Sequence, residues 1–130
     1  GGSIWNIGEI KKIRTVCRKN NLSLHLDGAR LFNTLVETGE TPKDHGQLFD
    51  SISICLSKGL GTPVGSVLIG SKAFIKKALR IRKTFGGGMR QAGYLAAAGI
   101  YALENNIPLL KKDHLRAVSI GKMLKKLEVV

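Results

Sequence analysis

The chain has 130 residues and a mass of 14.1 kDa, which corresponds to one ordinary domain or to part of a larger one. Hydrophobic residues make up 43% and charged residues 23%, a composition that excludes a disordered chain. Apolar stretches fall far short of the ~20 residues that a membrane helix needs, and no signal peptide is visible. We therefore expect a folded domain that does not insert into a membrane.

The net charge of +12 is unevenly distributed along the chain. Residues 1–50 carry seven basic and six acidic groups, whereas residues 51–103 carry eight basic groups and no acidic group. Such a segment favours an anionic partner, either a nucleic acid or a small ligand that bears a phosphate.

The two cysteines, Cys17 and Cys55, lie among apolar neighbours. A disulfide-stabilised domain of this size would carry more cysteines. We expect both to be reduced, buried thiols of a cytoplasmic protein, because no histidine near either one in the sequence would activate a catalytic thiolate.

In the first half of the chain, apolar residues recur at helical spacing over 6–19, which predicts an amphipathic helix. Residues 22–26 alternate in polarity and predict a short strand that Asp27 and Gly28 close. Helical spacing returns over 29–38, and residues 51–56 predict a second strand.

In the second half, residues 64–70 predict a third strand, and Ser71 is placed to cap the helix that follows. Three consecutive glycines at 86–88 interrupt that helix. A helix rich in small residues is predicted over 90–105, and Pro108 starts a last helix that runs to about residue 127.

This order of elements predicts an α/β fold with a mostly parallel sheet flanked by helices. Three strands are few for such a domain, whose sheets usually hold about 5–6 strands. The first helix also feeds a strand for which no earlier strand is present. Both features indicate a piece from the middle of a longer chain.

Asp27 ends the first predicted strand, and Lys58 follows the second by two residues. Adjacent parallel strands present their carboxyl ends at one edge of a sheet, where ligands bind, so we expect these two side chains to converge. The alternative is a strand-end aspartate that caps the next helix and a solvated loop lysine.

The loop after Lys58 contains Gly59, Gly61, Pro63 and Gly65, which indicates an irregular, tightly fitted backbone. We expect the amine on such a loop to be partly desolvated, which favours its attack on carbonyl compounds. A carboxylate beside a cationic ring nitrogen is the usual partner of that amine in pyridoxal phosphate (PLP) enzymes.

Lys83 and Arg90 flank the three glycines just before a predicted helix N-terminus. Free backbone N–H groups, the helix dipole and two cations together suit a phosphate or carboxylate. A flexible hinge with nothing bound is the other interpretation. His25, His45 and His114 are scattered without metal-ligand spacing, so we expect no metal site.

Three separated motifs carry a resemblance to a known family: HLDGAR over 25–30, SICLSKGLGTPVGS over 53–66 and RKTFGGGMRQAG over 82–93. They resemble the threonine aldolase branch of the β-eliminating lyase family, over nearly the whole chain and in the same order. The resemblance implies the large domain of a fold type I PLP enzyme, which cleaves L-threonine and L-allo-threonine to glycine and acetaldehyde.

The resemblance also implies a role for individual residues. Lys58 matches the catalytic lysine that bonds to PLP, and Asp27 matches the carboxylate that pairs with its ring nitrogen. Arg30 matches an arginine near the cofactor's O3′ and the substrate carboxylate. Lys83 and Arg90 match basic residues near the phosphate, at least one of them reaching into a neighbouring subunit's site.

Two loop residues receive further expectations. Ser57 is expected to orient Lys58 or to contact the phosphate. Thr62 stands where the family more often has alanine, and its extra hydroxyl is expected to be tolerated.

The family pattern divides the chain into residues 1–107, part of the PLP-binding large domain, and 108–130, a helix that leads toward a truncated small domain. A ring-stacking histidine and a phosphate-binding loop are expected upstream of residue 1. We therefore expect a fragment that is inactive alone, taken from a cytoplasmic homo-oligomer, a dimer of dimers, with an amino acid as substrate.

Two alternatives stay open. Another PLP-dependent lyase of the superfamily would share this cofactor pocket. A small basic nucleic-acid-binding module would require aromatic side chains on its basic face, but the basic segment holds only Phe74 and Phe85. For this reason we expect no nucleic acid partner.

Overall fold

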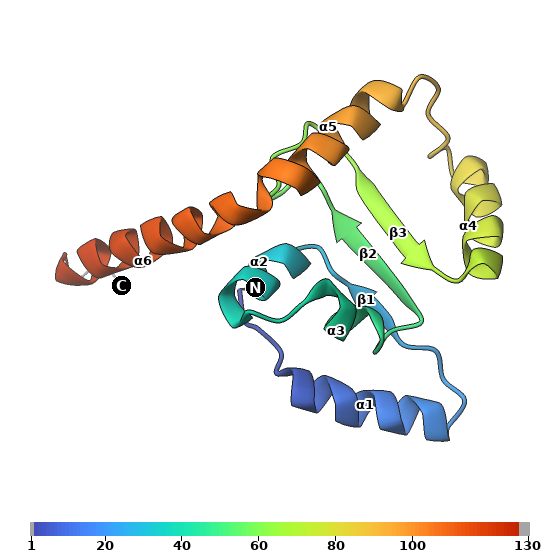
Figure 1. The fold of residues 1–130 in the computed structure, drawn as a ribbon, viewed down its shortest axis with the longest axis horizontal. Coiled ribbons are helices and arrows are strands. Elements are labelled where there is room, and N and C mark those ends of the chain that lie inside the picture. The colour runs from blue at the N-terminus through green and yellow to red at the C-terminus, as the bar shows by residue number, and fades with distance from the viewer. Residues whose placement is uncertain (1, 128–130) are drawn as a thin grey trace.

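The computed structural model describes residues 2–127 and confirms the α/β class (Figure 1). The elements in chain order are α1 (Ile7–Lys19), β1 (His25–Asp27), α2 (Leu31–Thr38), α3 (Pro42–Gly46), β2 (Ser51–Cys55), β3 (Ser66–Gly70), α4 (Lys72–Thr84), α5 (Gly93–Asn105), the 3-10 helix η1 (Ile107–Leu109) and α6 (Leu110–Lys126).

Side-chain caps and one glycine set several helix ends. The Asn6 side chain accepts a hydrogen bond from the Gly8 N–H at 2.7 Å and starts α1. Ser71 caps α4 by accepting from the Phe74 N–H at 3.2 Å, as predicted. Gly39 ends α2 in the left-handed conformation, with φ of 75°.

Local turns shorten three of the predicted elements. Helix α2 begins at Leu31 rather than residue 29, because the Leu31 N–H bonds the Gly28 carbonyl in a turn. Strand β3 begins only after Gly65, whose φ of 130° is incompatible with a regular strand. Helix α5 begins at Gly93 because Gln91, with φ of 49°, breaks the helical backbone before it.

The sheet has the order β1-β2-β3 and is mixed rather than mostly parallel. Strands β1 and β2 are parallel, with Asp27 opposite Ser53. Strands β2 and β3 are antiparallel, with Cys55 opposite Ser66. A parallel return needs a crossover of about a dozen residues, usually a helix, and the loop over 56–65 contains none, so β3 folds back beside β2.

Two apolar clusters form the core. The first joins α2 to one face of β2 through Leu31, Leu35, Ile52 and Ile54. The second lies where the loop after β2 meets the C-terminal helices, and it contains Leu56, Leu60, Ala102 and Leu110. In Figure 1, α1 to α3 lie on the β1 side of the sheet, α4 lies beside β3, and α6 extends away from the sheet.

Two further expectations concern the state of the cysteines and the ability of a helix to span a membrane. Cys17 and Cys55 are free, as predicted for reduced thiols, but they are half-buried rather than buried. Over residues 2–127, every helix is too short or too polar to cross a lipid bilayer.

Candidate active site

Asp27 is held at the end of β1 by a close approach of two strands. The Gly28 N–H donates to the Ser53 carbonyl at 2.7 Å, and a Cβ added to Gly28 would lie only 2.8 Å from that oxygen. One Asp27 oxygen accepts from the Ala29 N–H at 3.1 Å. The carboxylate is exposed, so its other oxygen is free for a ligand.

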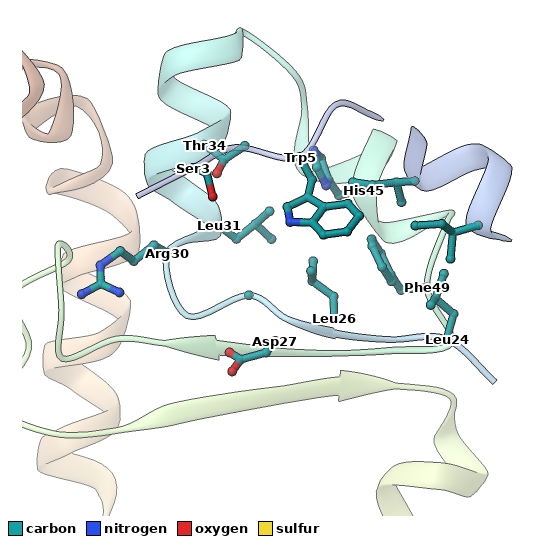
Figure 2. Close-up of a pocket in the computed structure, with 13 residues that line it drawn as sticks. Ser3, Trp5, Leu24, Leu26, Asp27, Arg30, Leu31, Thr34, His45 and Phe49 are labelled. Carbon is teal, nitrogen blue, oxygen red and sulfur yellow. The ribbon is translucent and has the colours of Figure 1, made fainter. Parts of the chain in front are cut away.

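Asp27 and its neighbour Leu26 both line an apolar cavity, although their side chains leave β1 on opposite sides. Figure 2 shows Asp27 and Leu26 on opposite sides of the β1 backbone. Leu26 faces a cavity of about 370 Å³ whose lining also includes Trp5, Phe49 and the buried His45. His45 Nε2 lies 2.7 Å from Glu40 Oε2, whereas its Nδ1 is buried and has no hydrogen-bond partner among the described residues.

Arg30 lies beside Asp27 and shares a second cavity with it. This cavity, of about 580 Å³, lies between α2 and α6 and is closed on one side by residues 2–4. Arg30 immediately precedes α2, and its side chain is exposed. The structure therefore brings the predicted carboxylate and the predicted guanidinium to one recess.

Lys58 lies on a loop that backbone hydrogen bonds close. The Gly61 N–H donates to the Lys58 carbonyl at 2.9 Å, and the Leu56 N–H donates to the Gly65 carbonyl at 2.9 Å. Leu60 turns inward and is 3% exposed, which anchors the loop. Positive φ at Gly61 completes the turn.

The expectation that Lys58 is partly desolvated is wrong for the described residues. Ser57 and Lys58 are exposed, because the loop directs its apolar neighbours Leu56 and Leu60 inward and these two polar residues outward. The hydroxyl of Thr62, by contrast, is buried against its own loop, 3.4 Å from the Val64 carbonyl.

The parallel pairing of β1 and β2, on which the predicted convergence of Asp27 and Lys58 depends, is confirmed. Asp27 is the last residue of β1, and Lys58 comes three residues after β2 ends at Cys55. Because β1 and β2 are parallel, both residues follow the carboxyl ends of adjacent strands and lie at the same edge.

The glycine segment after α4 does not form the predicted cluster of free N–H donors. The Gly86 N–H bonds the Lys83 carbonyl at 3.1 Å, and the Gly87 N–H bonds the Arg82 carbonyl at 2.8 Å. Both groups close the end of α4. The Gly86 and Gly87 amides are therefore not free to bind an anion, since the end of α4 uses them.

Lys83, in the last turn of α4, and Arg90, in the segment that leads into α5, are both exposed. That segment joins α5 at the end opposite the loop between β2 and β3 (Figure 1). Asn106, just after α5, donates to the Leu60 carbonyl at 2.8 Å and ties that end to the loop. The 13 residues of α5 span about 20 Å. Within the described chain, these two cations are not brought to Asp27 and Arg30.

Sequence reasoning missed a polar group between α2 and α6. Asn33, Glu37 and His114 line the same cavity as Asp27 and Arg30. A hydrogen bond from His114, reinforced by the charge of Lys111, lowers the pKa of Glu37 below its ordinary value. The only signal for Asn33 was its place one helical turn after Arg30, and the pairing of His114 with α2 left no trace in the sequence pattern.

The described residues hold no group of three or more histidine, cysteine, aspartate or glutamate side chains arranged for a metal ion. The polar groups at the sheet edge are instead one carboxylate, one guanidinium and one amine.

Comparison with known proteins identifies the family. The model of the beta-eliminating lyase family matches residues 1–130. The chain belongs to the beta-eliminating lyase family. This beta-eliminating lyase chain is 53% identical over 116 residues to a low specificity L-threonine aldolase from Escherichia coli, covering 89% of the chain and 35% of that protein. It is 50% identical over 120 residues to a low-specificity L-threonine aldolase from Candida albicans, covering 92% of the chain and 32% of that protein.

Solved structures agree with this lyase family assignment. A candidate L-allo-threonine aldolase from Listeria monocytogenes superposes with a TM-score of 0.78 at 28% identity, over 86% of the chain and 31% of that structure. A candidate aromatic amino acid beta-eliminating lyase/threonine aldolase from Exiguobacterium superposes with a TM-score of 0.71 at 37% identity, over 79% of the chain and 30% of that structure. The chain spans about a third of the length of the curated relatives it matches.

Proposed function

We propose that the full-length protein is a PLP-dependent low-specificity threonine aldolase that cleaves L-threonine and L-allo-threonine to glycine and acetaldehyde. The observation that carries the proposal is the placement of Asp27 and Lys58 at one sheet edge with Arg30 beside Asp27. The names of relatives at 50–53% identity agree with it.

The residues at this edge fit PLP. The free oxygen of the Asp27 carboxylate is available to accept a hydrogen bond from a protonated ring nitrogen. The Lys58 amine, on a closed loop at the same edge, is available to bond the cofactor's aldehyde carbon. An acid for the ring nitrogen and an amine for the aldehyde carbon are the groups that PLP requires.

Bound PLP supplies a protonated pyridine ring that accepts electrons from the breaking Cα–Cβ bond. Asp27 keeps the ring nitrogen protonated through its negative charge. Arg30 has a planar guanidinium that holds a substrate carboxylate by two parallel hydrogen bonds, which a lysine cannot do. Lys58 would be the amine that holds the cofactor in the absence of substrate. The proton lost from the β-hydroxyl goes to a base supplied from outside residues 1–130.

Lys83, Arg90 and Ser57 complete the proposed cofactor site. Lys83 and Arg90 bind the phosphate, at least one of them in the site of a neighbouring subunit, which accounts for their distance from the Lys58 loop within one chain. Ser57, next to Lys58 and exposed like it, orients the lysine or contacts the phosphate. Because the phosphate site is shared between subunits in this proposal, the full-length enzyme is a homo-oligomer, a dimer of dimers. We place it in the cytoplasm.

Residues 1–107 form part of the PLP-binding large domain in this proposal, and 108–130 lead toward a small domain; residues 128–130 lie outside the described residues. The ring-stacking histidine and the phosphate loop come from upstream of residue 1. The 130-residue chain is therefore inactive alone, and robust cleavage of threonine by that chain would contradict this division.

The test compares two lysine variants of the full-length protein. With added PLP, the parent protein is expected to show the long-wavelength absorbance of lysine-bound cofactor and to release acetaldehyde from L-threonine. Lys58→Ala loses both, whereas Lys72→Ala, which removes an exposed lysine at the start of α4, keeps both. A parent that takes up PLP but acts only on other β-substituted amino acids would support a different lyase of the superfamily. A parent that stays colourless would contradict the proposal.

A further inference from the structure

The Asn33 side chain packs directly against the residue that follows Lys58. A Cβ added to Gly59 would lie 3.0 Å from Asn33 Oδ1 and 2.8 Å from Leu110 Cδ2. The backbone of the loop therefore touches α2 through Asn33 and α6 through Leu110. The Asn33 amide therefore limits the space open to Gly59, the residue next to Lys58.

His114 on α6 determines how the Asn33 amide is oriented. Its Nε2 lies 3.2 Å from Asn33 Nδ2, and its Nδ1 lies 3.0 Å from Glu37 Oε2. The Glu37 carboxylate can only accept, so His114 Nδ1 carries the proton. Asn33 Nδ2 can only donate, so His114 Nε2 is unprotonated. These two bonds specify the neutral Nδ1–H tautomer and leave Asn33 Oδ1 facing Gly59.

We propose that Asn33 is a positioning residue for the Lys58 loop, and that His114, oriented by Glu37, holds the Asn33 amide in the required orientation. The inference rests on the proposed function, because it assigns the polar group to the lysine that bonds PLP. It adds three residues from α2 and α6 to the set that determines where that amine lies.

Other side chains contact the Lys58 loop at its far end, so Asn33 is the polar residue placed to position the end that carries Lys58. Leu60 and Ala102 hold the loop from the apolar side, and Asn106 binds the Leu60 carbonyl, so the loop is fixed at its far end. At the Lys58 end, the side chains of Asn33 and Leu110 lie closest to Gly59. The charged groups around His114 are Glu37 on α2 and Lys111 on α6, whose Nζ lies 3.7 Å from the Glu37 carboxylate.

The proposal predicts a graded response in the full-length holoenzyme. Asn33→Ala and His114→Leu are expected to lower kcat for threonine about 10-fold while KM changes less than about twofold, since a misplaced amine slows the chemical step more than binding. His114→Gln should retain most of the activity, because its amide can donate to Glu37 and accept from Asn33. Asn105→Ala, which removes an exposed asparagine bonded only to the Tyr101 carbonyl, is the matched control.

A second readout does not depend on catalysis. In the full-length protein without PLP, hydrogen exchange of the peptide over 57–61 should accelerate in Asn33→Ala and His114→Leu but not in His114→Gln or Asn105→Ala. In the parent protein, the ¹⁵N spectrum of His114 at neutral pH should show the Nδ1–H tautomer. These measurements do not require PLP or activity. They therefore test the role of Asn33 even if Lys58→Ala still binds PLP and the proposed function is wrong.

Three results would overturn the inference. The first is a His114→Gln variant that is as impaired as His114→Leu. The second is an Asn33→Ala variant in which hydrogen exchange over 57–61 is unchanged and the loss of activity merely follows the loss of unfolding free energy. The third is an Nε2–H tautomer at His114 in the parent protein, and this readout decides the matter if the Asn33 variant does not fold.

Discussion

Helices α2 and α4 are both amphipathic and both have defined ends, but among the described residues only α2 packs its apolar face against the rest of the chain. Helix α2 buries Leu31 and Leu35 against β2, whereas α4 buries no residue, and its Leu79 is 50% exposed. Asn33 lies on the packed helix, with Arg30 immediately before it, and Lys83 lies on α4. Helical periodicity thus identifies the apolar face of a helix, but it does not tell whether residues of this chain pack against that face.

Core truncation should give the largest difference between the two regions. In the 130-residue chain, Leu110→Ala removes a side chain that is 1% exposed and should cost about 2–5 kcal/mol of unfolding free energy. Leu79→Ala on α4 should change it by less than about 0.5 kcal/mol. Chemical denaturation measures both. Equal losses, or the absence of a cooperative transition in the parent chain, would contradict the packing described here.

The same pair of variants sharpens the comparison in the full-length protein. The Leu110→Ala cost should persist there. A cost of Leu79→Ala that rises well above its value in the 130-residue chain would show that a segment outside these residues covers α4.

A smaller effect is expected where β1 approaches β2. Gly28→Ala places a Cβ against the Ser53 carbonyl, where backbone must shift, and should cost about 1–3 kcal/mol. Gly46→Ala, at the end of α3 with open space around it, should be neutral or stabilise by up to about 1 kcal/mol. Thermal unfolding of the two variants compares them, and a harmless Gly28→Ala would refute the close approach that positions Asp27.

The smallest effect concerns the attachment of α1 to the packed region. Arg14 holds Asp50 through two hydrogen bonds of 2.5 and 2.8 Å, and the Leu24 N–H adds a third at 2.8 Å. The Arg14 guanidinium first, and then the Leu24 N–H, lower the pKa of Asp50 from 3.8 to about 2. Because the folded-state pKa is the lower one, the stabilisation is complete above 3.8 and is lost as the pH falls through about 2.

Asp50→Asn tests this attachment. The variant should be less stable than the parent at neutral pH, and the gap should close as the pH is lowered toward 2, followed by urea denaturation at each pH. A gap that is independent of pH would assign the effect to packing rather than to the carboxylate charge.

Elements that depend on neighbouring residues in the chain could be predicted from the sequence. Examples are the Ser71 cap, the stop of α2 at Gly39 and the shared edge of Asp27 and Lys58, each of which follows from local chemistry or strand order. The antiparallel return of β3 was not foreseen, because sequence alternation is blind to strand direction.

Features that depend on distant residues could not be predicted. Exposure of Lys58 depends on which loop residues find a core partner, and Leu60 finds one in Ala102 and Leu110. The contact between Asn33 and His114 joins residues 81 positions apart and requires α6 to lie on α2. The Gly86 and Gly87 N–H groups bond carbonyls at the end of α4, and the sequence pattern locates a helix end only approximately.

Peptide mapping after borohydride reduction shows directly whether PLP attaches to Lys58. The full-length protein is incubated with PLP, reduced so that the cofactor becomes irreversibly fixed to its lysine, digested and analysed by mass spectrometry. The account predicts the added mass on the peptide that contains Lys58 and its disappearance in Lys58→Ala. Stoichiometric label on another lysine, or none in the parent, would contradict it.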